Sequence, residues 1–325
     1  MLTIPIQVSG DCWNNQTDVK QLLDQTRPGD RIMLDLCSEG PSLHRLGVVD
    51  LVDQYRLEVC VTRWSNSIES VPYRRVFCNS NSHFFPMSHH YWVEEIPNFD
   101  NAEFRFALFL GRGCPSRNRI LYDVYHRYSN SFLLSKMSCG NGDPWGIKHT
   151  TSYQLLETMK QWFDSTDLDQ TWFDRCPIVS IDNHNVQDQF VVPEVSSGNM
   201  ARSLLQHYQR FNVELVCETY TLGETFFPTE KTIRPIIGNR PFLVHGPVNY
   251  LNNLRQRGFK TFGELWDESY DKLEGMCRWL AMRKLIDGLS TMSQTQWNQT
   301  IQHCKEIVKH NRNQVRKIIR DLKGI

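Results

Sequence analysis

Residues 106–110 form a nearly continuous apolar run, Phe-Ala-Leu-Phe-Leu. A strand that is apolar at every position is typical of a parallel sheet with helices on both faces, because neither face is open to water. Gly111 and Gly113 follow the run, and Pro115 stands where a helix would begin. This stretch therefore predicts a strand, a turn and a crossover helix, which together form the repeating unit of an α/β fold.

Short apolar segments alternate with amphipathic ones over most of the chain. We expect strands at residues 1–8, 31–36, 59–63, 106–110, 131–136, 213–217 and 242–245. We expect helices at residues 17–25, 46–55, 154–163, 201–211 and 229–237, another from residue 115, and a helical tail over 270–325. This spacing predicts parallel pairing through right-handed crossovers, and a length of 325 residues fits two domains.

The composition excludes several classes of function. The chain has 36 basic and 36 acidic residues, so its formal net charge of zero argues against bulk binding of nucleic acid. Its ten cysteines are irregularly spaced without a Cys-x-x-Cys pair, unlike a disulfide framework or a zinc site. The first residues lack the basic segment of a signal peptide, and no window reaches the roughly 20 apolar residues of a membrane helix. We therefore expect a cytoplasmic protein.

The segment from Glu218 to Pro235 combines a strand end, a loop and a helix start. Thr229 is a good N-cap, so Glu230 and Lys231 fall in the first helical turn. The free N–H groups and the dipole at such a helix start favour a diphosphate, to which Lys231 adds a point charge, while Glu230 can accept two ribose hydroxyls. The alternative is an ordinary capped helix with a surface ion pair.

This segment resembles the donor-binding motif of the α1,3-fucosyltransferase family. The matching residues occur in the family's order over about thirty positions: Cys217-Glu218-Thr219, then Thr229-Glu230-Lys231, then Pro241 to Pro247. The resemblance implies a GT-B fold, in which two Rossmann-like domains face each other across a cleft, and a nucleotide-sugar donor site that includes Glu218, Thr219, Thr229, Glu230 and Lys231. Because Thr219 stands where the family has Asn, the sugar and the base stay open.

A second match supplies the catalytic base that the resemblance implies. Arg27 to Arg31, an apolar strand and then Ser38 to Ser42 resemble the family's acceptor-side stretch, in which a glutamate is the proposed base. Glu39 takes that position here, and Asp35 is its substitute. Gly40 departs from the family's usual Ser, and Glu39-Gly-Pro-Ser is also good turn chemistry without any catalytic role.

A third match implies a phosphate clamp. Residues 114–118 and Tyr122 resemble the family segment in which an arginine after a strand reaches the donor pyrophosphate. Arg117 matches that arginine, and Arg112 is a second candidate. A planar guanidinium suits this task because it can bind two phosphate oxygens. The alternative is an arginine on an exposed first turn of a helix.

The resemblance implies an inverting glycosyltransferase that needs no metal and moves a sugar to a hydroxyl of a glycan, a protein or a modified nucleobase. The expected domains are an acceptor-side domain at 1–100, a donor-binding domain at 101–270, and C-terminal helices at 271–325 that pack back on the first domain. Residues 258–262 and 266–271 together are also similar to segments of uncharacterised viral and phage proteins of this type, which would place the chain in the host cytoplasm. The alternative is an inactive, glycosyltransferase-like binding or structural protein, again of viral type.

Other motifs are weaker. Asp167 and Asp169 have the spacing of a metal clamp but lie in a polar loop, and no third ligand accompanies His89 and His90. Asp267, Glu268 and Asp271 either close the donor site or, as we favour, simply solvate a helix start. The tail is basic, with Lys305, Lys309, Arg312, Arg316, Lys317, Arg320 and Lys323 against Glu306 and Asp321. This is either a solvated helix face or a peripheral contact with an anionic membrane.

Overall fold

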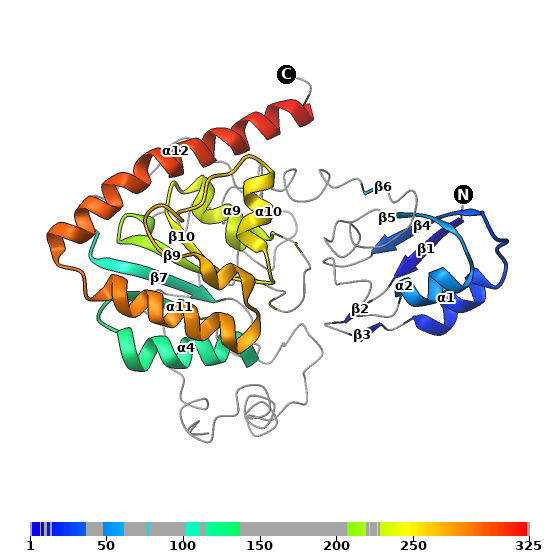
Figure 1. Ribbon diagram of the computed structural model, residues 1–325, viewed down its shortest axis with the longest axis horizontal. Helices are drawn as coiled ribbons and strands as arrows, with labels where there is room; N and C mark the ends of the chain where they lie inside the picture. Colours follow the sequence, from blue (N-terminus) through cyan, green and yellow to red (C-terminus); the bar gives the residue numbers. More distant parts are fainter. Residues whose placement is uncertain are drawn as a thin grey trace.

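The computed structural model is a mixed α/β protein with two parallel sheets (Figure 1). The residues that it describes are 2–6, 8–9, 12–13, 15–36, 48–61, 77–78, 102–110, 115–136, 207–218, 221, 226 and 228–323. Within them, the helices and strands agree with the α/β class that the alternation of apolar segments predicts.

The N-terminal unit holds a parallel sheet whose strands lie side by side in the order in which the chain forms them. These strands are β1 (Leu2–Ile6), β4 (Arg31–Leu36), β5 (Glu58–Val61) and β6 (Phe77–Cys78). The unit also contains α1 (Gln16–Leu23), α2 (Val48–Gln54) and an antiparallel pair, β2 (Val8–Ser9) and β3 (Cys12–Trp13). Ile4 and Ile32 are buried whereas Thr3 and Arg31 are exposed, which is the alternation of strands with one covered face.

The second unit is built on a more deeply buried parallel sheet. Its strands lie in the order β10 (Phe242–His245), β9 (Phe211–Cys217), β7 (Phe104–Leu110) and β8 (Phe132–Lys136). Every residue of β9 and β10 is buried, as is β7 from Phe106 to Leu110. The prediction of strands covered on both faces is confirmed here.

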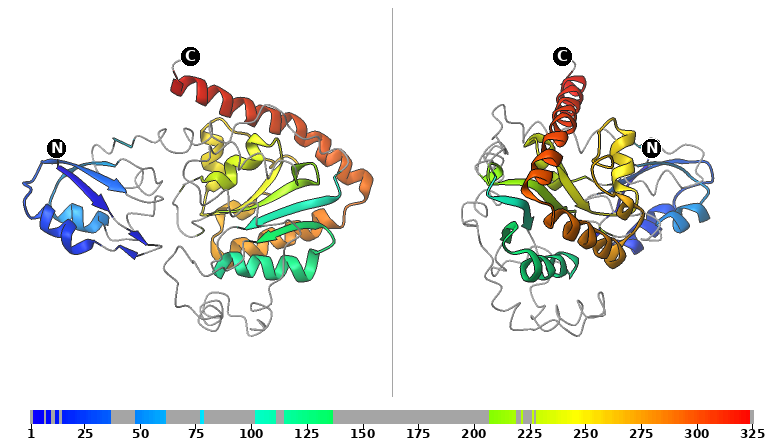
Figure 2. Two further views of the ribbon diagram at one scale, coloured as in Figure 1. Left: turned by 180° about the vertical axis from the view of Figure 1, so that it is seen from behind. Right: turned by 60° about the vertical axis from the view of Figure 1, so that its left-hand side comes forward.

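Helices cover the two faces of this second sheet (Figure 2). α4 (Pro115–Tyr128) and α11 (Gly275–Ser290) lie together on one face, where the indole Nε1 of Trp279 donates to Asp123 Oδ2 at 2.7 Å. α9 (Glu230–Ile237) covers the other face, and its Arg234 forms an ion pair with Glu214 of β9. The sheet is therefore the middle layer of three, an arrangement that leaves the ends of its strands for function.

The C-terminal helices belong to the second unit in all the contacts described here. α12 (Gln294–Lys323) runs along α9, and its Arg312 donates to the carbonyl of Ile237 at the end of α9. The indole of Trp297 donates to Asn212 Oδ1 of β9 at 2.8 Å. The described contacts of these helices are with the second unit, and the expectation that they pack back on the first domain stays a prediction. The division at residues 100 and 270 stays a prediction.

Other expected elements differ from the structure at their ends. The helix expected at 201–211 does not reach its predicted end, because Phe211 opens β9. α10 (Tyr250–Gln256) was not expected, and the helical tail is divided into η2 (Ser269–Lys272), α11 and α12. The helix expected at 154–163 lies outside the described residues. Among the helices of the described part, none is long and apolar enough to cross a membrane.

Candidate functional site

The strand order of the second sheet reverses between β7 and β9. From β7 the chain moves outward to β8, and the later strands β9 and β10 lie on the opposite side of β7. In open parallel sheets, ligands bind outside the carboxyl ends of the strands at such a reversal, because the two crossovers leave in opposite directions there. The candidate site is therefore the region at the ends of β7 and β9.

Arg117 lies at this reversal. It stands in the first turn of α4, the helix that follows β7, and its side chain is buried. Its Nη2 donates to the carbonyl oxygen of Cys217, the last residue of β9, at 3.3 Å. The guanidinium thus joins the two central strands at their carboxyl ends, and the alternative of an exposed arginine is wrong.

The start of α9 lies beside the same strand ends. Thr229 is the N-cap, as predicted, with extended backbone angles (φ −100°, ψ −176°), and its Oγ1 accepts from the backbone N–H of Lys231 at 3.3 Å. The ammonium of Lys231 also donates to Thr229 Oγ1, at 3.2 Å. Glu230 opens the helix, which places it in the first turn as expected; its side chain lies outside the described part of the structure.

Glu218 follows β9 directly, and its carboxylate is only 1% exposed. Oε1 accepts from the Thr229 N–H at 3.1 Å, from Thr232 Oγ1 at 2.6 Å and from the Tyr250 hydroxyl at 2.9 Å. Oε2 accepts from Thr229 Oγ1 at 2.6 Å. Both oxygens of the buried carboxylate are thus bound by groups of the protein, three donors on Oε1 and one on Oε2.

The cluster around Glu218 extends to α10. The hydroxyls of Tyr250 and Thr232 are 2.8 Å apart, so these two groups contact each other as well as the carboxylate. Burial, followed by the charge of Glu218, raises the pKa of Tyr250 well above its usual value. The Tyr250 ring packs against Phe226, whose ring also lies under the Arg257 guanidinium at 4.5 Å. Tyr250 and Thr232 therefore act as neutral hydrogen-bond donors.

A buried ion pair, Arg278 with Asp271, lies at the end of β10 and binds the backbone there and at the start of α10. Arg278 of α11 donates to the carbonyls of Val244 and Pro247, at 3.0 and 2.9 Å, and forms an ion pair with Asp271 at 3.0 Å. Asp271 in turn accepts from the N–H groups of Leu251 and Asn252 in the first turn of α10. Asp271 therefore binds the start of α10 from inside the protein, where it is 4% exposed, whereas the expectation for it was a solvated helix start.

His245 is the last residue of β10 and is fully buried. Its Nε2 lies 3.4 Å from the Gly275 carbonyl, and its Nδ1 has no hydrogen-bond partner among the described residues. Burial, and then the charges of Arg278 and Arg117, lower the pKa of His245 to about 3. The imidazole is therefore neutral at physiological pH and adds no charge to the site.

The structure brings four of the predicted site residues to one sheet edge: Arg117, Glu218, Thr229 and Lys231. Asp35 lies in β4 of the other unit, where its backbone pairs with Pro5. Glu39, Arg112 and Thr219 lie outside the described residues, as do Asp167, Asp169 and His89. The residues that the sequence did not point to are Thr232, Tyr250 and Arg278, because none belongs to a local motif and each contacts partners far away in the chain.

The described part of the chain contains no group of three or more His, Cys, Asp or Glu residues that could hold a metal ion. In comparisons with known proteins, no family model matches the chain, and no curated protein matches it either.

Proposed function

We propose that the chain is an inverting glycosyltransferase of the GT-B type, which moves a sugar from a nucleotide diphosphate to an acceptor hydroxyl without a metal ion. The observation that carries the proposal is Arg117, which reaches the end of β9 across the strand reversal, beside the capped start of α9. An arginine and a helix start at one sheet edge suit a diphosphate, because both offer N–H donors and positive charge.

Lys231 is the third contributor to this diphosphate site. Its ammonium donates to Thr229 Oγ1, so its positive charge lies at the helix start where the proposed diphosphate would bind. When the bond to the sugar breaks, the leaving diphosphate gains negative charge. Arg117, Lys231 and the N–H groups of α9 would stabilise that charge, since they are fixed in place before the reaction.

The transfer step needs a base on the acceptor side. Glu39, with Asp35 as its substitute, would take the proton of the acceptor hydroxyl while that oxygen bonds to the anomeric carbon. The bond from the anomeric carbon to the diphosphate oxygen breaks in the same step, so the configuration at that carbon inverts. Glu230 would bind the ribose hydroxyls of the donor.

A screen of nucleotides tests the proposal. We expect UDP or GDP, or one of their sugar derivatives, to raise the melting temperature of the protein in the presence of EDTA, because ligand binding stabilises the folded state. Incubation of the best donor with candidate acceptors should then release free nucleotide diphosphate. Binding without transfer would favour the alternative of an inactive glycosyltransferase-like protein, and no shift with any nucleotide would contradict the proposal.

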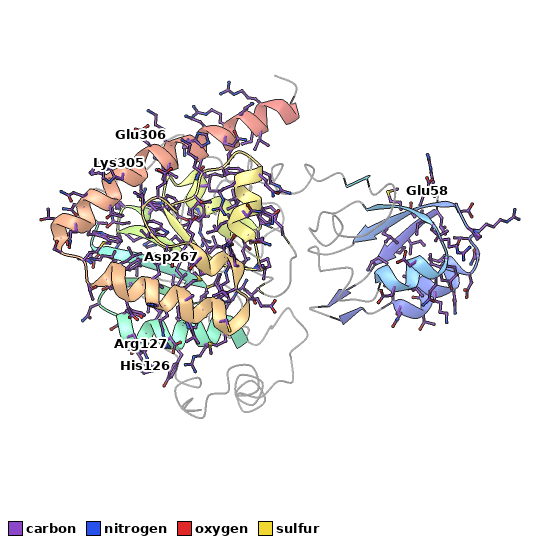
Figure 3. The ribbon with its side chains drawn as sticks, viewed as in Figure 1. Glu58, His126, Arg127, Asp267, Lys305 and Glu306 are labelled. Carbon is purple, nitrogen blue, oxygen red and sulfur yellow. The ribbon has the colours of Figure 1, made fainter. Side chains whose placement is uncertain are left out.

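A pair of arginine variants on α4 locates the site. Arg117→Lys keeps the charge but loses the planar fork, so affinity for the diphosphate should fall about tenfold. Arg127→Lys is the matched control, because Arg127 lies exposed near the other end of the same helix (Figure 3). Equal affinities of the two variants would remove Arg117 from the site.

A further inference from the structure

Two buried glutamates, Glu214 in β9 and Glu218 directly after it, face α9. They are four residues apart, and each contacts a residue of α9 or its N-cap. Glu214 is fully buried, accepts from Tyr208 Oη at 2.6 Å and is paired with Arg234 in the second half of α9. Glu218 binds Thr229 and Thr232 at the start of the same helix. One carboxylate thus fixes each end of α9.

The two glutamates fix their ends of the helix in different ways. Glu214 holds its end through the charged side chain of Arg234. Glu218 instead accepts from hydroxyls and from the Thr229 backbone N–H, which is a donor at the helix start itself. Its negative charge is placed next to the positive end of the α9 dipole, which stabilises a carboxylate buried there.

A continuous chain of hydrogen bonds connects Glu218 to Lys231. The ammonium of Lys231 donates to Thr229 Oγ1, and that hydroxyl donates to Glu218 Oε2. The backbone N–H of Lys231 also donates to Thr229 Oγ1. The orientation of the Thr229 hydroxyl is therefore set by the carboxylate, and the position of Lys231 is set by that hydroxyl.

We propose that Glu218 is a positioning residue that, with Thr232 and Tyr250, fixes the start of α9 so that Lys231 and the first N–H groups face a nucleoside diphosphate. It is buried and both of its carboxylate oxygens are bound by groups of this chain, so it acts on the ligand through Thr229 and not by contact. The identity of the ligand rests on the proposed function, whereas the positioning of the helix start does not.

Backbone amide exchange tests the positioning directly. Glu218→Gln keeps the shape of the side chain but places an NH₂ group where at least one donor now binds. The amides of Thr229 and Lys231 should then exchange about tenfold faster or more. The amide of Gly238, which donates to Arg234 O at 2.8 Å at the other end of α9, should change less.

Glu214→Gln is the matched control, because it neutralises the other buried glutamate that contacts α9. In this variant the effect should be reversed, with faster exchange at Gly238 and little change at Thr229 and Lys231. Affinity for UDP or GDP, measured by calorimetry, should fall about tenfold in Glu218→Gln and stay near that of the natural protein in Glu214→Gln. Unchanged exchange at Thr229 and Lys231 in folded Glu218→Gln would overturn the proposal.

A second variant covers the case in which Glu218→Gln does not fold. Tyr250→Phe removes one donor and keeps the ring that packs against Phe226. It should give smaller changes in the same direction, both in exchange at the start of α9 and in nucleotide affinity, and no change in either would overturn the proposal. Failure of the natural protein to bind any nucleotide would contradict the proposed function, while the exchange data would still decide the role of Glu218.

Discussion

In the first sheet, the chain adds strands in one direction, from β1 through β4 and β5 to β6, whereas in the second sheet it returns to the other side of its first strand. Among the described strands, only the second sheet therefore has a reversal at which two crossovers separate. Arg117 and Lys231, two described residues whose side chains can bind phosphate, lie next to that reversal. Strand order, more than the α/β class that both units share, indicates where a ligand would bind.

The two units also differ in how they use charge. The ion pair between Arg31 and Glu58 in the first sheet is open to solvent, with side chains 65% and 42% exposed. The second unit also has an exposed pair, Arg210 with Glu103, but its Arg278 and Asp271 are only 0% and 5% exposed. Arg278 binds carbonyls at the end of β10 and Asp271 binds N–H groups of α10, so this buried pair fixes backbone next to the candidate site, which an exposed pair does only weakly.

The largest expected effect is on the rate of sugar transfer, and it distinguishes the proposed base in the first unit from the proposed donor site in the second. Glu39→Gln should lower the rate of sugar transfer about 100- to 10,000-fold, because a general base contributes that much, and should leave donor affinity unchanged. Arg117→Lys should weaken donor binding instead. Steady-state kinetics and calorimetry on both variants check this division. Loss of donor binding in Glu39→Gln would contradict it.

The next largest effect should be the loss of stability caused by removing a buried cation. Arg278→Leu leaves Asp271 buried without its cation and deprives the carbonyls of Val244 and Pro247 of their donor. We expect a loss of about 3–5 kcal/mol in the free energy of unfolding, measured with urea. Arg283→Leu on the same helix is the control, because its partner Asp123 is 3.6 Å away and its side chain is partly exposed. A similar loss of unfolding free energy in Arg278→Leu and Arg283→Leu would refute the special role of Arg278.

Lowering the pH should destabilise the second unit, because His245 is buried in its neutral form. Its pKa is lowered to about 3 in the folded protein from an ordinary value of 6.5. As the pH falls below 6.5, the unfolded chain takes up a proton that the folded chain excludes, so stability falls by about 2 kcal/mol at pH 5. His245→Gln should flatten the pH dependence of unfolding between pH 7.5 and 5. If the free energy of unfolding depended equally steeply on pH in the natural protein and in His245→Gln, ionisable groups other than His245 would control the acid sensitivity.

The smallest effect should come from the exposed pair of the first sheet. Glu58 lies on the outside of the N-terminal unit (Figure 3), and Glu58→Gln should change the free energy of unfolding by less than about 1 kcal/mol. Thermal unfolding in low and high salt measures this effect, which salt should reduce further. A loss as large as that of Arg278→Leu would erase the contrast between the units.

Much of the fold follows from local patterns. Apolar runs predict β7 and β9 because strands buried on both faces need apolar side chains at consecutive positions, and Thr229 marks the start of α9 by its capping chemistry. The end predicted for the helix at 201–211 was wrong, since the tertiary pairing of Phe211 with Phe104 determines the strand conformation of Phe211. Periodicity cannot supply such a pairing, because its partner lies far away in the chain.

The candidate site was only partly predictable for the same reason. Arg117 and Lys231 belong to local motifs at helix starts, so the sequence pointed to them. The role of Glu218 depends on Tyr250, thirty-two positions away, and that of Asp271 depends on Arg278 together with two N–H groups of α10. Contacts of this kind arise from how the helices pack, and no single segment of sequence carries their signal.

The pairing of β7 with β9 has a consequence for how the protein folds. The strands pair parallel, Phe106 with Val213, although about one hundred residues separate them, so a long loop must close before the centre of the sheet exists. Trp297, which binds Asn212, is synthesised later still. We expect slow folding with a high contact order, in which a nascent chain keeps the apolar face of β7 exposed until β9 has left the ribosome. Chaperone dependence during synthesis would then be greatest between these two strands.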